Sequence, residues 1–232
     1  HLYKKYGPEC VKQLEGMFAF AIFEGDGFML ARDPIGIRPL YYGYQDGNLY
    51  FTSELGAMTL AGVDEVHEFP AGHYYTPGEG FVKYYNIPKI QDHILTDVDE
   101  TCEKIRTTFI KAVKDRLLAD REVPVGAFCS GGLDSSLVAA IAAEDIPNLH
   151  TFVVGMRDKN GDLSDDVKAS RIAAKHIGCT HHELLFTEAE YHEALPTVIQ
   201  KLETYDPSLV RCAVPCYFTC KLAADYVTVV LT

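Results

Sequence analysis

The stretch Ser-Gly-Gly-Leu-Asp-Ser-Ser at residues 130–136 decides how the fold of this chain is predicted. An apolar, valine-containing run precedes it at residues 123–129, and a helix-like run follows at residues 137–143. A strand, a tight loop and a helix in this order suit an anion site, because glycines let backbone N–H groups approach an anion and the first amides of a helix are unpaired. The stretch therefore predicts a phosphate-binding loop.

The aspartate of this loop, Asp134, makes the prediction more specific. A carboxylate repels a neighbouring phosphate unless a cation lies between them, and magnesium is the usual cation among oxygen ligands. The loop thus predicts a magnesium–nucleotide site with Asp134 as the metal ligand. A glycine–serine turn alone is weak support, because many strand-to-helix turns have this composition for packing reasons.

Composition limits the classes of function. The chain has 232 residues, of which 47% are hydrophobic, so it can bury a core in one large or two modest domains. Its net charge of −12 disfavours a nucleic-acid or anionic-membrane partner. No apolar run approaches the ~20 residues of a membrane span, and the seven cysteines cannot all pair within the chain. We expect a cytoplasmic protein with reduced thiols.

Residues 1–91 carry the signals of an antiparallel sheet. The apolar run at 17–23 predicts a strand buried on both faces, and the turns at 25–27 and 46–48 predict hairpins. A linker at 87–96 leads to a second pattern, so we place a domain boundary near residue 92. The predicted fold class of this first part is α+β.

Residues 92–232 alternate between strand and helix patterns. Asp97 and Glu100 form a capping-box signature at the start of a helix. Strands are predicted at 123–129, 151–154, 182–186 and 226–231, and helices at 135–143, 165–177, 188–204 and 209–224. This alternation predicts an α/β doubly wound parallel sheet with helices on both faces.

Several segments resemble known families. Residues 130–136 resemble the pyrophosphate-binding loop of ATP pyrophosphatases, and they lack the Gly-Lys-Ser or Gly-Lys-Thr ending of the other common phosphate loop. Residues 203–206, Glu-Thr-Tyr-Asp, are similar to a segment of asparagine synthetases. Four further segments resemble the second half of the glutaminase domain of amidotransferases with an N-terminal cysteine nucleophile: 14–20, 32–42, 52–54 and 68–74. In this order, the segments resemble glutamine-hydrolysing asparagine synthetases over nearly the whole chain.

The resemblance implies a reaction. The aspartate side chain would attack the α-phosphate of ATP to give β-aspartyl-AMP and pyrophosphate, and ammonia derived from glutamine would then displace AMP to give asparagine. Residues 1–91 would be the C-terminal part of a glutaminase-like domain, and residues 92–232 the N-terminal part of the ATP-pyrophosphatase domain. ATP, aspartate, and ammonia or glutamine would be the substrates, Mg²⁺ the cofactor, and the full-length protein a candidate homodimer.

The resemblance also assigns site residues. The nucleotide would contact Phe128 in the adenine pocket, Val154 and Thr232 at other strand ends, and the loop residues Ser130, Gly131, Gly132, Leu133, Asp134 and Ser135. Ser208 and Arg211 match positions that contact ATP phosphates, so the catalytic set is Asp134, Ser208 and Arg211. Considered without the resemblance, Phe128 is a core residue, Val154 an ordinary strand exit, and Arg211 a surface arginine paired with Glu203 or Asp206.

The sequence also departs from the family pattern. The glutaminase nucleophile must be an N-terminal cysteine, whereas residue 1 is His1 and Cys10 is internal, so we expect residues 1–91 to keep the sheet without glutaminase chemistry. The family segment Gly-Glu-Gly-x-Asp-Glu would follow Thr232. Both ends look truncated, and we expect a fragment that is inactive alone. A β-lactam-synthetase-like adenylating enzyme and a non-catalytic nucleotide-binding module are the alternatives.

Two other clusters are predicted to be structural. Cys212, Cys216 and Cys220 recur every fourth residue, which could place three metal ligands along one helix face, but we favour core packing for them. His181 and His182 are adjacent in a predicted strand, so their side chains should lie on opposite faces of the sheet and not form a metal site.

Overall fold

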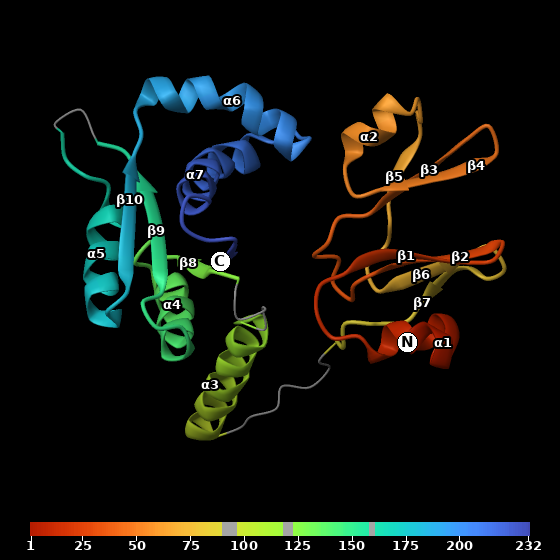
Figure 1. Cartoon of the computed structure of the whole chain (residues 1–232), viewed down its shortest axis with the longest axis horizontal. Coiled ribbons are helices and arrows are strands. Elements are labelled where there is room, and N and C mark those ends of the chain that lie inside the picture. The colour runs from red at the N-terminus through yellow and green to blue at the C-terminus, as the bar shows by residue number, and fades with distance from the viewer. Residues whose placement is uncertain (90–96, 118–122, 158–160) are drawn as a thin grey trace. The chain divides into compact units, whose positions relative to one another are not determined.

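A computed structural model of the protein describes residues 1–89, 97–117, 123–157 and 161–232. The chain divides into two compact units, His1–Ile94 and Leu95–Thr232 (Figure 1). The boundary predicted near residue 92 lies outside the described residues. None of the helices in the described ranges is long and apolar enough to cross a membrane.

The first unit contains two antiparallel sheets, arranged as layers in Figure 1. One sheet has the order β1-β2-β6-β7 and the other the order β4-β3-β5. Their strands are β1 Ala19–Glu24, β2 Gly27–Arg32, β3 Tyr41–Gln45, β4 Asn48–Thr52, β5 Val66–Glu68, β6 His73–Thr76 and β7 Gly80–Lys83. Short helical elements complete the unit: α1 Leu2–Tyr6, the 3₁₀ helix η1 Gly7–Gln13 and α2 Leu55–Leu60.

Both predicted hairpins are confirmed. Glu24 pairs with Gly27 across the first turn, and Gln45 pairs with Asn48 across the second. In the second turn Asp46 and Gly47 have φ angles of 51° and 78°. Positive φ at both central residues matches the right-handed twist of the flanking strands, which explains why an Asp-Gly pair occupies this position.

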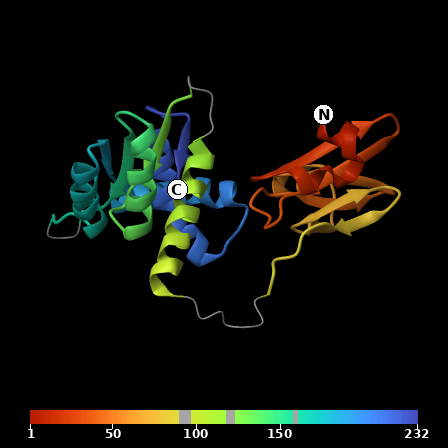
Figure 2. The ribbon, with the colours of Figure 1, turned by 90° about the horizontal axis from the view of Figure 1, so that it is seen from below.

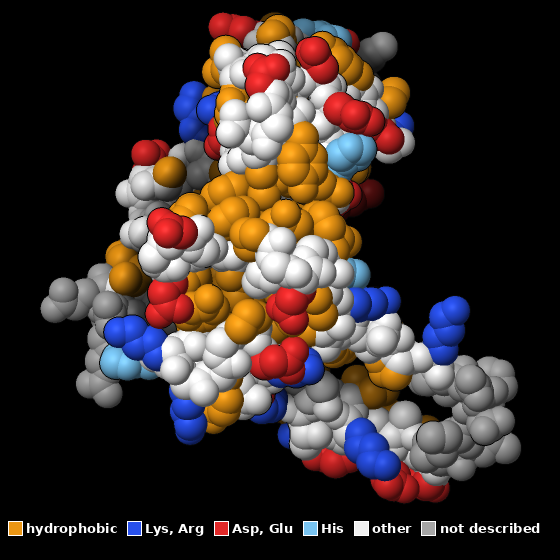
Figure 3. Space-filling model, turned by 90° about the vertical axis from the view of Figure 1, so that its right-hand side faces the viewer, with side chains coloured by type: hydrophobic (Ala, Val, Ile, Leu, Met, Phe, Trp, Pro, Cys, Tyr) orange, Lys and Arg blue, Asp and Glu red, His pale blue; other side chains and the backbone are white. Residues whose placement is uncertain are grey.

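The strand predicted at 17–23 is more exposed than expected. It begins at Ala19 and is the edge strand of its sheet, and Phe23 keeps 69% of its surface exposed. Alternate side chains do reach two apolar clusters, with Phe20 packed toward Met29 and Ala21 toward Leu30. The prediction of burial on both faces therefore holds only in part: residues 19–22 are half-buried, and Phe23 and Glu24 are exposed. Figure 3 shows hydrophobic side chains gathered on the surface of this unit.

The second unit is built on a four-stranded parallel sheet with the order β10-β9-β8-β11. The strands are β8 Val125–Phe128, β9 His150–Gly155, β10 Thr180–Leu185 and β11 Val229–Leu231. The helices are α3 Val98–Lys114, α4 Leu133–Asp145, α5 Asp165–Ile177, α6 Glu188–Leu202 and α7 Pro207–Ala223, with a 3₁₀ turn η2 Asp115–Leu117. Helices α5 and α7 cover opposite faces of β9 and β10 (Figure 1), which confirms the predicted parallel α/β sheet.

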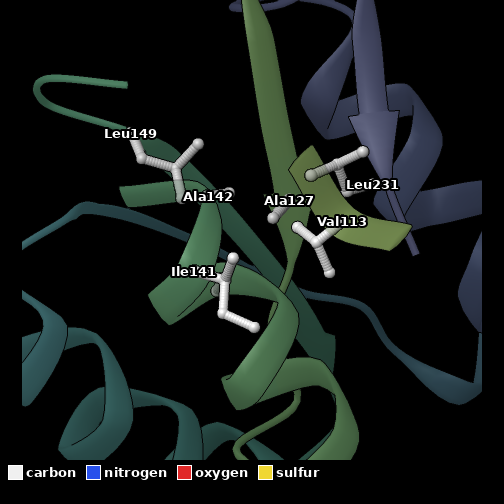
Figure 4. Close-up of a cluster of buried hydrophobic side chains, with 7 residues drawn as sticks. Val113, Ala127, Ile141, Ala142, Leu149 and Leu231 are labelled. Atoms are coloured by element: carbon white, nitrogen blue, oxygen red, sulfur yellow. The ribbon is translucent and has the colours of Figure 1, made fainter. Parts of the chain in front are cut away.

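The core of this unit joins elements that are distant in sequence. Helix α3 packs against α4 (Figure 2). Side chains from α3, β8, α4 and β11 converge in one buried cluster (Figure 4), which contains Val113, Ala127, Ile141, Ala142, Leu149 and Leu231. This cluster packs the second half of α4 against β8, because it contains residues of both elements.

Helix boundaries follow local signals. The side chain of Asp97 accepts hydrogen bonds from the N–H groups of Asp99 and Glu100, at 2.9 and 3.1 Å, and begins α3. Helix α5 ends at Gly178, whose φ of 80° is left-handed. The strand predicted at 226–231 is shorter, because the Tyr226 and Val227 N–H groups bond to the Ala223 carbonyl in a turn after α7.

The prediction that Cys212, Cys216 and Cys220 pack in the core was wrong. All three are exposed, and all seven cysteines are free. The buried face of α7 is formed instead by Val210, Val214 and Phe218, which repeat at the same spacing of four residues. Two parallel stripes on one helix compete for burial, and the larger apolar side chains occupy the sheet side.

Candidate functional site

The order of strands places the 130–136 loop at a reversal of the chain path. From β8 the chain proceeds through α4 to β9 and through α5 to β10, and it then returns through α6 and α7 to β11 on the other side of β8. In open parallel sheets, ligands bind outside the carboxyl ends of the strands at such a reversal. The loop follows β8, and Thr232 follows β11, so both lie at this point.

Gly131 allows the loop to pack directly against the backbone of helix α5. Its φ is 83°, and a Cβ atom added here would lie 2.4 Å from the backbone carbon of Ala169 and 2.4 Å from the backbone nitrogen of Ser170. No side chain fits in this space. Gly132 has an extended backbone with φ −68°, and its nearest neighbour to an added Cβ, the Ser130 Oγ, is 3.5 Å away. Close approach to α5 thus requires a glycine at 131 and not at 132.

Two of the three serines of the loop, Ser130 and Ser135, stabilise its shape. The Ser130 N–H donates to Ser135 Oγ at 3.2 Å, and the two Oγ atoms are 3.1 Å apart. Ser135 Oγ donates to the Gly132 carbonyl at 3.3 Å, and the Gly132 N–H donates weakly to Ser130 Oγ at 3.4 Å. The hydroxyls that were predicted to contact nucleotide therefore also fix the shape of the loop.

The amides that follow are free to bind an anion. Leu133, Asp134 and Ser135 are the first three residues of α4, and in the described part of the chain their N–H groups have no hydrogen-bond partner. The helix dipole adds a partial positive charge at the same end. Gly132, Leu133 and Asp134 are exposed, so these amides open to the surface. This arrangement can bind a phosphate group.

Asp134 supplies one carboxylate to this edge. It is exposed in the first turn of α4, where an acidic side chain also interacts favourably with the helix dipole. Across the described ranges, no three His, Cys, Asp or Glu side chains form a cluster that could hold a metal ion. A single carboxylate fits magnesium that keeps several waters and is shared with substrate phosphates, which is the usual manner of binding for this ion.

Phe128 and Val154 lie beneath the loop on the α7 side of the sheet. Phe128 packs with Phe152 and Val227, and Val154 packs near Phe186 and Val214. Both are half-buried, as expected for core residues of a strand. Phe128 pairs with Phe152 in the sheet register, so Val154 lies two residues farther toward the carboxyl edge.

Three further predicted residues reach the same edge. Leu231 pairs with Ala127, so Thr232 stands level with Phe128 and is exposed. Helix α7 leads into the parallel strand β11, so its first turns, with Ser208 and Arg211, lie at the carboxyl end of the sheet. Both side chains are exposed. Among the residues described, no hydrogen bond or ion pair joins Ser208 or Arg211 side chains to the loop.

The alternative reading of Arg211, a surface ion pair with Glu203 or Asp206, is not seen within the described structure. The Asp206 carboxylate caps α7 instead, accepting hydrogen bonds from the Ser208 and Leu209 N–H groups at 2.8 and 3.1 Å. The Arg211 guanidinium makes no ion pair within residues 1–89, 97–117, 123–157 and 161–232. It remains available to an anion at this edge.

The structure adds residues that the motif search did not identify. Ser170 lies on α5 where Gly131 contacts that helix, and its side chain is fully buried. Ser164, the residue before α5, lies beside Gly155 at the end of β9, and its buried Oγ has no hydrogen-bond partner in the part of the chain that is described. A serine before two aspartates is a helix-start signal, which could have indicated the position of Ser164 but not its burial.

Among the described residues, two pockets are lined by residues of the first unit. One of about 330 Å³ is lined by Met17, Phe18, Ala19, Arg38, Pro39 and Ser53. The other, of about 230 Å³, is lined by Arg32, Ile35, Gly36, Glu68, Phe69, Pro70 and Ala71. Neither includes a residue of the 130–136 loop, whose amides face the open surface.

Comparisons with known proteins identify relatives of both units. The family model for asparagine synthase matches residues 104–232, and the model for a glutamine amidotransferase domain matches residues 1–60. The chain is 37% identical over 243 residues to a probable glutamine-hydrolyzing asparagine synthetase from Dictyostelium discoideum, covering 94% of this chain and 42% of that protein. It is also 37% identical to asparagine synthetase 3 from Arabidopsis thaliana, covering 94% of this chain and 38% of that protein.

A bacterial relative gives a similar match. Asparagine synthetase B from Escherichia coli (strain K12) is 37% identical over 239 residues, covering 93% of this chain and 41% of that protein. All three relatives are named as glutamine-hydrolyzing enzymes. The chain spans about two fifths of their length.

Proposed function

We propose that this chain, which belongs to the asparagine synthase family, binds ATP with magnesium at the carboxyl edge of its parallel sheet. We propose further that this site serves an ATP-dependent ligase that makes asparagine from aspartate and glutamine-derived ammonia. One observation carries the proposal: three unpaired amides, of Leu133, Asp134 and Ser135, face the surface where the chain path reverses.

Each part of the edge has a role in this proposal. The free amides of α4 hold the pyrophosphate portion of ATP, and Gly131 lets the loop rest on α5 in the required shape. Ser208 and Arg211 contact phosphate oxygens from the first turns of α7, because an exposed guanidinium suits the multiple charges of a phosphate group. Phe128, Val154 and Thr232 border the base and sugar from the ends of three adjacent strands.

Asp134 would hold magnesium together with phosphate oxygens, and the ion would supply positive charge to balance the departing pyrophosphate. The protein's own contribution is positional. Attack of the aspartate side-chain carboxylate on the α-phosphate yields β-aspartyl-AMP, and little covalent chemistry is required of protein side chains in such a step. Fixed amides and a guanidinium lower its barrier by orienting the leaving group and balancing its charge.

The first unit has the other part in this proposal. Residues 1–60 match a glutamine amidotransferase domain, so ammonia would come from glutamine at a site to which this unit belongs. Homodimer formation by the full-length protein and a cytoplasmic location stay predictions from the sequence.

The test measures MgATP binding through the change in the thermal unfolding midpoint of the chain. We expect MgATP to raise the midpoint of the wild type and not of Asp134→Ala. Asp166→Ala is the matched control, because Asp166 is an exposed aspartate in the first turn of the neighbouring helix α5. Equal protection of Asp134→Ala and the wild type would contradict the proposed magnesium ligand, and no protection of any variant would contradict the ATP site.

The reaction is tested on the full-length protein. Pyrophosphate release that depends on aspartate, with asparagine as product, is the expected result. Release that does not depend on aspartate, or a cyclised amide product, would contradict asparagine synthesis. It would favour an adenylating enzyme with a different acceptor.

A further inference from the structure

A chain of hydrogen bonds crosses the sheet face on which the loop rests. The Thr151 Oγ1 lies 2.9 Å from His181 Nδ1, and His181 Nε2 lies 3.1 Å from Ser170 Oγ. Ser170 Oγ donates to the Val167 carbonyl at 2.9 Å. Thr151 and Ser170 have no exposed surface. The chain therefore links β9, β10 and α5 through buried polar groups.

The proton positions in this chain follow from its ends. Because Ser170 Oγ uses its hydrogen on the Val167 carbonyl, it can only accept from His181, so His181 carries its hydrogen on Nε2. A neutral imidazole then accepts at Nδ1, and Thr151 donates to it. Thr151 Oγ1 also lies 3.2 Å from Cys179 Sγ, which donates its hydrogen to the Ala174 carbonyl at 3.6 Å. Every donor in this arrangement has an acceptor when His181 is neutral.

The far end of the chain touches the candidate site. The backbone nitrogen of Ser170 and the backbone carbon of Ala169 are the atoms against which Gly131 packs. The position of this turn of α5 therefore determines where the loop can lie. Within the described structure, Ser170 carries the only side-chain hydroxyl of α5. His181 Nε2 hydrogen-bonds to this hydroxyl and so holds the turn of α5 in place.

We propose that His181 is a positioning residue for the phosphate loop: its neutral imidazole, acting through Ser170, fixes the turn of α5 on which Gly131 rests. The expected effect of His181 on ATP binding rests on the proposed function. The contact between Gly131 and α5 is independent of that function.

Protonation of His181 would disturb the arrangement. Burial lowers the pKa of His181, and the charges of His182 and Arg171 act in the same direction, while Glu183 opposes them. A second hydrogen, on Nδ1, would face the hydroxyl of Thr151 and force its hydrogen toward Cys179, a weak acceptor. The charged ring would also be attracted to Glu183, whose carboxylate lies 3.7 Å from Nε2 and is paired with Arg171.

The sign of the pH effect follows. A histidine whose pKa is lowered in the folded state stabilises the fold fully above its ordinary pKa of about 6.5, and this stabilisation is lost as pH falls through the lowered folded value. The packing of the loop on α5 should therefore weaken as the pH falls.

The neighbouring histidine provides a matched control. His182 lies on the opposite face of β10, where its ring stacks on His150 and lies against the tilted ring of Tyr226, and its Nε2 lies 2.9 Å from His150 Nδ1. Burial and His150 lower the pKa of His182 as well. It is thus a half-buried histidine in the same strand, with no contact to α5 among the described residues.

The experiment compares the whole chain with His181→Gln, His181→Phe and His182→Gln at pH 7.5 and through a series of decreasing pH values. A glutamine amide can donate to Ser170 and accept from Thr151 without titrating, whereas a phenyl ring can do neither. The first readout is the Kd for MgATP. The second, which needs no ligand, is hydrogen exchange of the loop amides at 131–134.

We expect His181→Phe to weaken MgATP about fivefold at pH 7.5 and to speed exchange at Gly131, since about one hydrogen bond of positioning is lost. As the pH is lowered from 7.5, MgATP binding by wild type and His182→Gln should weaken alike, and binding by His181→Gln should weaken less. Wild-type affinity and exchange in His181→Phe, or an unchanged pH response in His181→Gln, would overturn the inference. If no variant binds MgATP, the proposed function fails, and the exchange rates alone still decide the role of His181.

Discussion

Among the turns of this chain that combine an aspartate with glycine, those after β2 and β8 use the aspartate in opposite ways. In the turn after β2, Asp33 is fully buried and accepts hydrogen bonds from the N–H groups of Ile37 and Arg38, both at 2.9 Å, and of Ile35 at 3.3 Å. In the turn after β8, Asp134 is exposed, and the amides around it are free. Amides that bond to a carboxylate within the protein are not available to a ligand.

The turn after β2 is also stabilised by Arg32. Arg32, only 5% exposed, donates to the carbonyls of Phe69, Arg38 and Gly36 at 2.6, 2.7 and 2.9 Å, and to Glu68 at 2.7 Å. Burial alone would raise the pKa of Asp33, but hydrogen bonds from the backbone of Arg38, Ile37, Ile35 and Gly36 outweigh it and lower the pKa. The turn is a structural joint between the two sheets.

The comparison indicates that the direction of the carboxylate separates a structural turn from a binding turn. An aspartate directed inward consumes the amides of its own loop, and one directed outward leaves them for phosphate. The substitutions below test this distinction, and the largest effect is expected where the carboxylate is buried.

Asp33→Ala should destabilise the first unit by about 3 kcal/mol, because it leaves the N–H groups of Ile35, Ile37 and Arg38 without their acceptor. Urea unfolding followed by tyrosine fluorescence would measure the loss. Asp26→Ala, an exposed aspartate in the β1–β2 turn, is the control and should change stability by less than about 0.5 kcal/mol. Similar losses in the two variants would refute the structural role of Asp33.

Gly131→Ala should cost about 1–3 kcal/mol in the second unit, since its Cβ would collide with the α5 backbone and its φ is left-handed. MgATP protection should also be lost. Gly132→Ala meets no atom closer than 3.5 Å and should keep the fold. Thermal unfolding with and without MgATP distinguishes the pair, and equal behaviour of both alanine variants would argue against close packing of the loop on α5.

The two units should lose folding stability differently as the pH falls. Because the pKa of Asp33 is below its ordinary value of 3.8, its contribution is fully present above that pH and is lost as pH falls through the lowered value. Urea titrations between pH 5 and 2.5 should show a steeper decline for wild type than for Asp33→Asn. Parallel curves would show that Asp33 does not titrate with unfolding.

Local signals made much of this fold predictable. Helix α5 was predicted with the bounds that the structure gives, 165–177, because Gly178 ends it and apolar residues repeat along it. Both hairpins followed from Asp-Gly pairs. Pairing of β8 with β11 could not be predicted, since it joins residues about a hundred positions apart and depends on packing of the helices between them.

The position of the candidate site could be predicted from the sequence, but the contacts within it could not. The motif located the loop at a strand end, but nothing in its spacing showed that Ser130 and Ser135 bond to each other or that Gly131 touches α5. The cysteine stripe was predicted to be buried because the competing stripe of Val210, Val214 and Phe218 was not considered. The roles of Ser208, Arg211 and Thr232 stay predictions, because they depend on a nucleotide.

The most direct test of the central claim is residue-resolved hydrogen exchange of the two turns with and without MgATP. The amides of Leu133, Asp134 and Ser135 should exchange rapidly in the free protein and become protected by MgATP. The amides of Ile37 and Arg38 should be protected in both states, because Asp33 already bonds to them. Slow exchange at 133–135 without nucleotide, or no change when MgATP is added, would contradict the proposal that this loop binds phosphate.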